Sequence, residues 1–357
     1  MILNFYLLKR FLLGLLVSLV VLVSIEIFFS FSSEMKYLNE GNYSFKMIFK
    51  YIILSIPRSI ETMFPYSVLI GTLLSLGAMA ADMEFVAMQS AGVSVKKIVI
   101  IILLQTFFIS SIFYIVVDSV VPKFSSEAET MRNTALKKQS YFDKNGTWFK
   151  NDSSFIKISE IYPDNRIRGV SVYTYDDNDQ LSTVNYIRSA KFTKGKWNLE
   201  DVIKIDLTVN PIIKEQFKSI ISDSLIDIKL INIKTDKPYS LSLKDVRRNI
   251  KYLESNNLDA SIQEKIFWDK VMKPIATVIM LFLAMPFIFG RMRSINASKR
   301  IVIGLFIGIT FFIISSILPN LGLIIGVNPF ISVMIPLIVF TILGQYIFKY
   351  QLESGLR

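Results

Sequence analysis

The sequence predicts a membrane α-helical bundle of six transmembrane helices with an inserted periplasmic all-β domain of jelly-roll type. Hydrophobic residues make up 52% of the chain and the mean hydropathy is +0.46, above the roughly 45–50% apolar content of soluble domains. Six apolar runs are each long enough for a membrane span of about 20 residues. Between the third and fourth runs, apolar and polar residues alternate as they do in strands.

The spans fall into two groups of three. Residues 1–121 contain the apolar runs 11–31, 64–81 and 98–117, and residues 265–357 contain the runs 271–290, 301–318 and 330–348. The second span is expected to begin earlier, near Ile52, and to be broken or kinked by Pro57 and Pro65. The first run is too long for a signal-peptide core and has no small-residue cleavage site after it, which predicts a retained helix.

Basic residues in the short loops set the expected orientation. They gather at Lys9 and Arg10, at Lys96 and Lys97, and at Arg291, Arg293, Lys299 and Arg300. Because positive charge favours the cytoplasmic side of short loops, these loops and both termini are expected to be cytoplasmic in a bacterial inner membrane. The inserted domain then lies in the periplasm.

The inserted domain is expected to occupy residues 122–264. Residues 122–140 have the composition of a polar helix, and residues 241–264 that of an amphipathic helix and linker. Between them, six stretches alternate like strands, namely GTWFK, SFIKISE, RGVSVYTY, STVNYIRSAKF, WNLEDVIKIDLTV and SLIDIKLINIK. Seven or eight short strands in a sandwich or jelly roll are predicted.

Composition excludes most enzymatic functions. The chain has no Cys and no His, which removes thiolate nucleophiles, imidazole bases and the usual zinc ligands. The sequence also lacks a P-loop, a nucleophile elbow and an HExxH helix, so no catalytic residue, metal site or cofactor is expected. The net charge of +11 belongs mainly to the membrane-flanking segments, because acids nearly balance bases in the inserted domain. A nucleic-acid partner is therefore not expected.

Four acidic residues lie within or beside the spans: Glu26, Glu61, Asp118 and Asp269. A charge at the bilayer centre costs about 3 kcal/mol on insertion scales, so each needs a partner or water. Arg58, one turn before Glu61, is a plausible partner for it. Asp118 and Asp269 are expected at the membrane surface. Glu26 lies deeper, and both a structural contact and a place on a substrate path stay open.

The loop between the second and third spans, residues 81–92, is predicted to form a short cytoplasmic helix near 82–91. Met83, Val86, Ala87 and Ser90 would share one side, Asp82 and Glu84 would lie in the first turn, and Gly92 would end the helix. Such a helix can dock on another protein or simply connect two spans at the interface.

Several stretches resemble the LptF/LptG permease family of the lipopolysaccharide-export ABC transporter, and its LptG-type members more than its LptF-type members. They are SIPRSIETMFPYSVLIG and LLSLGAMAADMEFVAMQSAG before the third span, and LFLAMPFIFGRMRS in the fourth. The order GTWFK, FIKISEI, GVSVYTYDDNDQL and AKFTKGKWNLEDV in the β domain is similar as well. The resemblance covers essentially the whole chain.

The resemblance implies a permease that extracts lipopolysaccharide from the inner membrane and passes it to a periplasmic bridge toward the outer membrane. The implied partners are an LptF-like permease, an LptB-like ATPase dimer and an LptC-like bitopic protein. Residues 82–91 would be the coupling helix, with Asp82, Glu84, Phe85 and Met88 facing the ATPase. Candidate substrate-binding residues are Lys36, Glu26 and Arg58, although Ser30 and Tyr37 stand where LptG-type proteins often have further lysines.

Three other interpretations stay open. The chain resembles the LptF-type sister subunit less closely but shares its architecture. A membrane-anchored periplasmic binding or scaffold protein would need fewer spans than this chain has. A membrane enzyme using Glu26, Glu61 or Asp118 as acid and base on a lipid would need catalytic motifs that the sequence lacks.

Overall fold

A computed structural model describes residues 2–136, 146–151, 153–162, 165–176, 178, 180–193, 195–222, 225–228, 230–231, 241–289 and 297–355. The chain forms two compact units. Unit 1 comprises Met1–Lys36, Ile52–Ser125 and Ser261–Arg357, and unit 2 comprises Tyr37–Tyr51 and Ser126–Ala260. Unit 2 thus includes the turn before the second helix and that helix's first residues, which the predicted boundaries assigned to the N-terminal spans.

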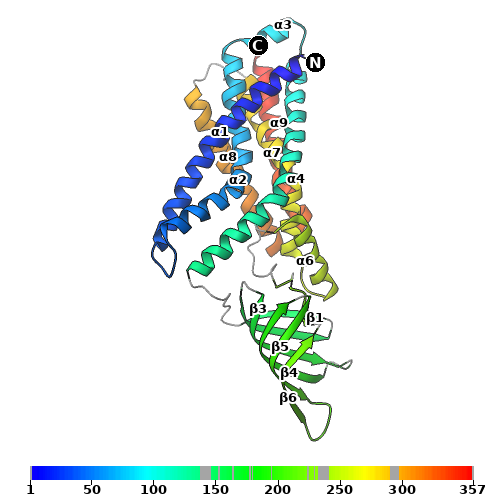
Figure 1. Cartoon of the computed structure of the whole chain (residues 1–357). Coiled ribbons are helices and arrows are strands. Elements are labelled where there is room, and N and C mark those ends of the chain that lie inside the picture. The colour runs from blue at the N-terminus through cyan, green and yellow to red at the C-terminus, as the bar shows by residue number, and fades with distance from the viewer. Residues whose placement is uncertain are drawn as a thin grey trace. The chain divides into compact units, whose positions relative to one another are not determined.

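Six helices are long and apolar enough to cross a membrane (Figure 1). They are α1 (Ile2–Glu34), α2 (Phe45–Ala81), α4 (Val95–Ala135), α7 (Ser261–Phe289), α8 (Ala297–Ile324) and α9 (Pro329–Gly355). The predicted number of spans is confirmed. Pro57 and Pro65 lie inside the single helix α2, which therefore continues through both positions.

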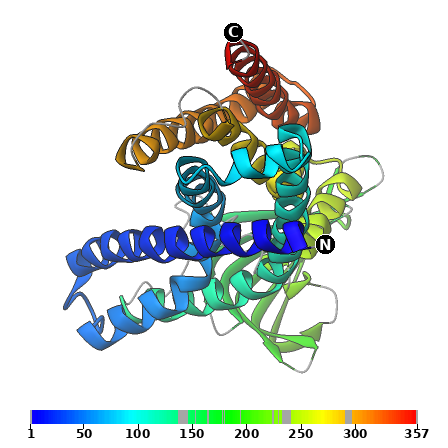
Figure 2. The same cartoon turned by 90° about the horizontal axis from the view of Figure 1, so that it is seen from above.

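The core of unit 1 is built mainly from α2 and α7. In the most apolar window of α2, 61% of the residues are buried, whereas the corresponding values for α1 and α8 are 22% and 24%. Phe64 stacks on Phe113 with ring centroids 3.8 Å apart, and Met280, Leu281 and Ala284 of α7 are almost fully buried. Figure 2 shows the C-terminal part of α2 between the dark blue α1 and the orange α8. The exposed faces of α1 and α8 are thus available to lipid or to another subunit.

Small residues let α1 and α8 approach α2 closely. A Cβ added at Gly71 of α2 would lie 2.6 Å from the carbonyl oxygen of Gly14 in α1, and one added at Gly304 of α8 would lie 2.6 Å from a methyl group of Leu73. Without a hydrophobic force between helices in lipid, such close packing is a main source of helix association.

Unit 2 contains one antiparallel sheet with its strands in sequence order. The strands are β1 (Thr147–Asn151), β2 (Ser154–Ile161), β3 (Arg166–Tyr175), β4 (Leu181–Thr193), β5 (Lys196–Asp206) and β6 (Ile213–Ser222). The helical bundle with an inserted β domain is confirmed, but the described residues form six strands in one sheet, fewer than the seven or eight expected. The predicted strand at 224–234 lies partly outside the described residues, and Leu225–Ile228 there is not a strand.

One face of the sheet carries the core of unit 2. The register aligns Ile158 with Val170, Val170 with Ile187, and Ile187 with Val202, and all four are at most 4% exposed. Trp197 is fully buried and its indole Nε1–H donates to the carbonyl of Ile226 at 2.8 Å. The alternating pattern of these strands therefore reflects one apolar face.

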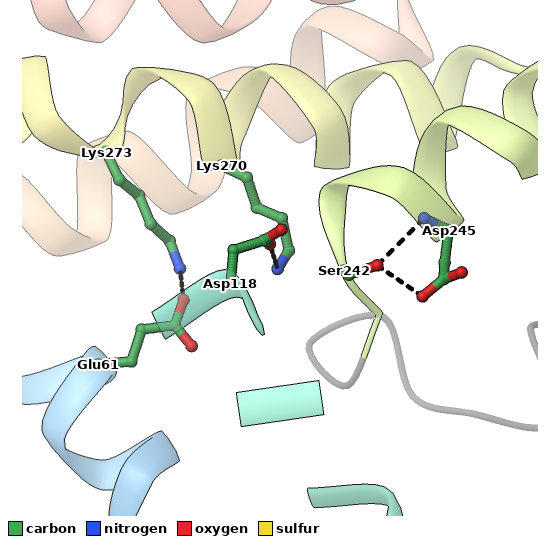
Figure 3. A network of polar contacts seen from close by, with 6 residues as sticks. All are labelled: Glu61, Asp118, Ser242, Asp245, Lys270 and Lys273. Carbon is green, nitrogen blue, oxygen red and sulfur yellow. Dashed lines mark hydrogen bonds and ion pairs between the residues drawn. The ribbon is translucent and has the colours of Figure 1, made fainter. Parts of the chain in front are cut away.

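The helix predicted within 241–264 is α6 (Leu243–Ser255). Its first turn is capped by Ser242, whose Oγ accepts from the Asp245 backbone N–H at 3.2 Å and donates to the Asp245 carboxylate at 2.6 Å (Figure 3). The Tyr252 hydroxyl of α6 donates to the carbonyl of Lys150 in β1 at 2.7 Å. The cap stabilises the first turn of α6. The bond from Tyr252 holds α6 against the first strand.

Candidate functional site: the short helix α3, α1 and the polar contacts of the bundle

The predicted loop helix is α3, Glu84–Ser90, shorter than expected. Asp82 precedes the helix, and Met83 adopts a left-handed conformation with φ 60°. At the other end, the N–H of Gly92 donates to Gln89 and that of Val93 to Met88, which is a Schellman motif with Gly92 at φ 85°. Gly92 therefore ends the helix as predicted.

The two faces of α3 differ. Phe85 is 3% exposed, packs on Phe289 of α7 with ring centroids 4.7 Å apart, and belongs with the half-buried Met88 to the core of unit 1. The opposite side is exposed and includes Met83 and Val86, with Asp82, Ala87 and Ser90. Phe85 and Met88, predicted to face a partner, thus anchor α3 to its own bundle, and the exposed side is free for a partner.

Two side chains of α1 bind the Glu84 carboxylate. Its Oε2 accepts from the Tyr6 hydroxyl at 2.8 Å, and its Oε1 pairs with Arg10 Nη2 at 3.1 Å. Arg10 Nε also donates to the Tyr6 hydroxyl at 3.0 Å, which closes a triangle of three side chains. Sequence reasoning missed this junction, because Arg10 was interpreted only as an orientation signal and Tyr6 was not considered.

The predicted substrate residues differ in their surroundings. Lys36 lies exposed in the 3₁₀ turn Met35–Tyr37, and within the described part of the chain neither Lys36 nor Glu26 has an ion pair. Glu26 Oε1 accepts a long bond of 3.4 Å from Ser30, while its Oε2 is buried without a partner among the described residues. Arg58 is half-buried on α2.

Three lysines of α7 neutralise the other membrane acids. Lys273 binds Glu61 of α2, and Lys270 binds Asp118 of α4 at 3.1 Å (Figure 3). Lys265 binds Asp269 within α7 at 3.4 Å. Glu61 therefore pairs with a lysine on another helix. The sequence had suggested only Arg58, one turn earlier on the same helix. These pairs lower the cost of placing acids within the spans and fix α7 to α2 and α4.

A cavity of about 340 Å³ lies beside these pairs in unit 1. Glu61, Lys273 and Asp269 line its polar part, and Met280, Phe311 and Leu337 line its apolar part. The Ser315 hydroxyl, also at this cavity, is buried without a partner in the described residues.

A second groove follows the core face of the sheet in unit 2. It has a volume of about 300 Å³ and is lined by Ile156, Val172, Ile187, Val202 and Ile220 among others. Ile156, Ile158, Val170 and Val172 lie on this core face of the sheet. Val184 and Tyr186 are on the opposite face, because the register pairs Val172 with Asn185 and Val170 with Ile187.

Sequence comparisons agree with this architecture. The family described as "Lipopolysaccharide export system permease LptF/LptG" matches residues 5–350. The chain is 29% identical to "Lipopolysaccharide export system permease protein LptG" of Escherichia coli strain K12 over 352 residues, covering 94% of each protein. It is 28% identical over 341 residues to the protein of the same name from Haemophilus influenzae, covering 95% of each.

Proposed function

Because the chain belongs to the LptF/LptG family of lipopolysaccharide export permeases, we propose that it is the LptG-type subunit of an ABC transporter. It extracts lipopolysaccharide from the inner membrane and passes the lipid to a periplasmic bridge toward the outer membrane. The similarity to two LptG proteins over nearly their full length supports this subunit type. The energy comes from a separate ATPase, since the sequence has no P-loop.

The observation that carries this proposal is the two-sided geometry of α3. A permease without its own nucleotide site can respond to ATP only through a contact that is firmly attached to its membrane helices. Phe85 supplies the attachment, and Met83 and Val86 offer an exposed apolar surface with Asp82 beside them. An LptB-like ATPase dimer docks on this surface, and the 22% exposed Glu84 carboxylate retains acceptor sites for a basic group of the ATPase.

The exposed faces of α1 and α8 suit a second permease and the lipid. An LptF-like subunit would complete the membrane part of the transporter, and an LptC-like protein would add a single helix. The α3 end faces the cytoplasm together with both termini, as the basic loops require. Unit 2 then lies in the periplasm.

Lipopolysaccharide offers phosphates and acyl chains, and the chain has groups suited to each. The exposed cation Lys36 suits a phosphate near the membrane surface. Glu26, whose buried Oε2 has no partner in the part of the chain that the structure describes, takes a donor from the lipid or from the partner subunit. The half-buried Arg58 is the third candidate. In unit 2, the apolar groove along Ile187 and Val202 shields acyl chains from water.

Docking on α3 is tested by co-purification of the chain with an LptF-type permease and the ATPase. Val86→Asp places a charge on the exposed face and should weaken ATPase association tenfold or more, without loss of the partner permease. Tyr350→Asp is the matched control, since Tyr350 is 67% exposed on α9, which ends on the same side as α3 (Figure 1). Equal ATPase association in both variants would contradict the proposal.

A further inference from the structure

We propose that Arg10 and Tyr6 are positioning residues that join α3 to α1, so that movement of α3 is carried along α1 to its far end. The proposal rests on the proposed function of α3 as the ATPase-docking helix. It concerns what happens after docking, namely which membrane helix receives the motion.

The junction is specific in its chemistry. The guanidinium of Arg10 reaches both other members of the triangle, with Nη2 on Glu84 at 3.1 Å and Nε on Tyr6 at 3.0 Å. The Tyr6 hydroxyl in turn donates to Glu84 at 2.8 Å. Lys9, the adjacent cation on α1, is exposed and makes no ion pair among the described residues. The contact therefore depends on particular side chains rather than on positive charge at this end of α1.

Apolar packing supports the polar junction. Leu7 and Phe11 of α1 are fully buried and belong to the same core cluster as Phe85 of α3. The Gln105 side chain of α4 also donates to the backbone carbonyl of Asn4 at 2.8 Å. The first turns of α1 are thus held by α3 and by the helix that follows α3, so a displacement of α3 acts directly on them.

The next contact along α1 has the features of a pivot. Gly14 meets Gly71 of α2 backbone to backbone, and Ser18 Oγ donates to the Ser67 carbonyl at 2.7 Å. After Ser18, only Val23 and Glu34 of α1 are buried, and Ile25, Phe28 and Phe29 are at least 49% exposed. The helix is therefore fixed at one close crossing and loosely packed beyond it.

This arrangement makes α1 a lever. The crossing with α2 is centred midway between Gly14 and Ser18. At 1.5 Å per residue, Arg10 lies about 9 Å before this point and the end of α1 about 27 Å beyond it. A rigid α1 would enlarge a displacement at Arg10 about threefold at its far end. Lys36, which follows α1 directly, would move with that end.

The test uses the complete transporter, with this chain, the partner permease and the ATPase in lipid nanodiscs. The chain has no Cys, so spin labels at Ser33→Cys of α1 and Ile331→Cys of α9 report one distance without background. Both positions are exposed. The distance is measured with and without ATP and vanadate, and ATPase association is measured in the same preparations.

We expect a nucleotide-dependent change in distance in the otherwise unaltered protein and in Lys9→Glu. Arg10→Glu should lose the change while the ATPase stays bound, and Tyr6→Phe, which removes only one hydroxyl, should reduce it. Arg10→Gln, which removes the charge but leaves Glu84 unaltered for the ATPase, should lose most of the change as well. Loss of the change in Arg10→Gln with the ATPase still bound is the outcome that a role of Glu84 in docking alone does not produce.

The inference is overturned if Arg10→Glu or Arg10→Gln retains the full change, or if Arg10→Glu releases the ATPase. Failure of the unaltered chain to bind the ATPase would instead refute the proposed function, and the inference with it. The two failures are thus distinguishable by the ATPase measurement.

Discussion

Glu84 is the residue on which the largest part of the account depends. Its carboxylate is held by Tyr6 and Arg10 within the chain, and it stands at the first turn of the helix proposed to meet the ATPase. Because the Arg10 side chain is 47% exposed, solvent screens the pair and it contributes little to the stability of the fold. A stability effect and a coupling effect can therefore be separated at this position.

Glu84→Lys should abolish lipopolysaccharide release from proteoliposomes while the protein still inserts and assembles with its partner permease. The variant places a cation opposite Arg10 and opposite a basic group of the ATPase, and losing one partner of a buried interfacial charge pair costs about 2–5 kcal/mol. Thermal unfolding should change little. Normal ATPase association together with normal release would refute the assignment.

Lys36→Glu should weaken photocrosslinking of lipopolysaccharide to the end of α1 more than Lys36→Ala does. The reason is that reversal adds repulsion of a phosphate, whereas truncation removes only an attraction that is modest at an exposed site. Crosslinking yields normalised to protein amount check this order. Equal yields in all three proteins would remove Lys36 from the binding site.

Among the elements, α3 shows how a short helix becomes a rigid surface feature. Seven residues are too few for a stable isolated helix, so its order depends on the Gly92 motif and on Phe85. Phe85 and Met88 pack into the core, whereas Val86 is exposed. The side of α3 that faces away from the bundle is therefore partly apolar.

Phe85→Ala should detach α3 from the bundle. Removing a buried aromatic ring commonly costs about 3–5 kcal/mol, and here the loss falls on a helix with few other contacts. Hydrogen exchange of the α3 amides should accelerate at least tenfold, and ATPase association should fall with it. Unchanged exchange in α3 would show that Phe85 is not its anchor.

The elements that were predicted correctly are those with a strong periodic signal. The six apolar runs and the alternating strands β1 to β5 needed only local patterns. The strand β6 was missed because IKEQFKSIIS lies at the sheet edge, where most of its residues are exposed and no alternation is imposed. Alternation alone does not tell which face of a strand is buried, since faces depend on register with a neighbouring strand.

Side-chain partners across long sequence separations could not be predicted. Lys273 and Glu61 are 212 residues apart, and Arg10 and Glu84 are 74 apart. Spacing within one helix could suggest only Arg58 for Glu61. The composition of α7, with three lysines among apolar residues, was the available signal that acids on other helices needed partners.

The two units of the molecule would have different tasks in lipid transport. Unit 1 would couple ATP hydrolysis to extraction of the lipid, and unit 2 would carry its acyl chains along the core face of the sheet. This division requires that unit 2 function on the opposite side of the membrane from the ATPase contact of α3.

Cysteine labelling tests that orientation without background, because the chain has no native Cys. Asn178→Cys in the exposed turn between β3 and β4, and Lys299→Cys at the start of α8, are both exposed positions. A membrane-impermeant maleimide added to intact spheroplasts should label position 178 and spare position 299 until the cells are lysed. Labelling of both from the same side would contradict the topology.

The most direct test of ATP-driven transfer is photocrosslinking of lipopolysaccharide in the reconstituted transporter. A photoreactive residue replaces Ile220, which lines the groove of the sheet, or Tyr186, which lies 43% exposed on the opposite face. The account predicts lipopolysaccharide crosslinks at position 220 that require both ATP and the ATPase, and few or none at position 186. No crosslink at position 220, equal crosslinking at the two positions, or crosslinking at position 220 that is independent of ATP would contradict it.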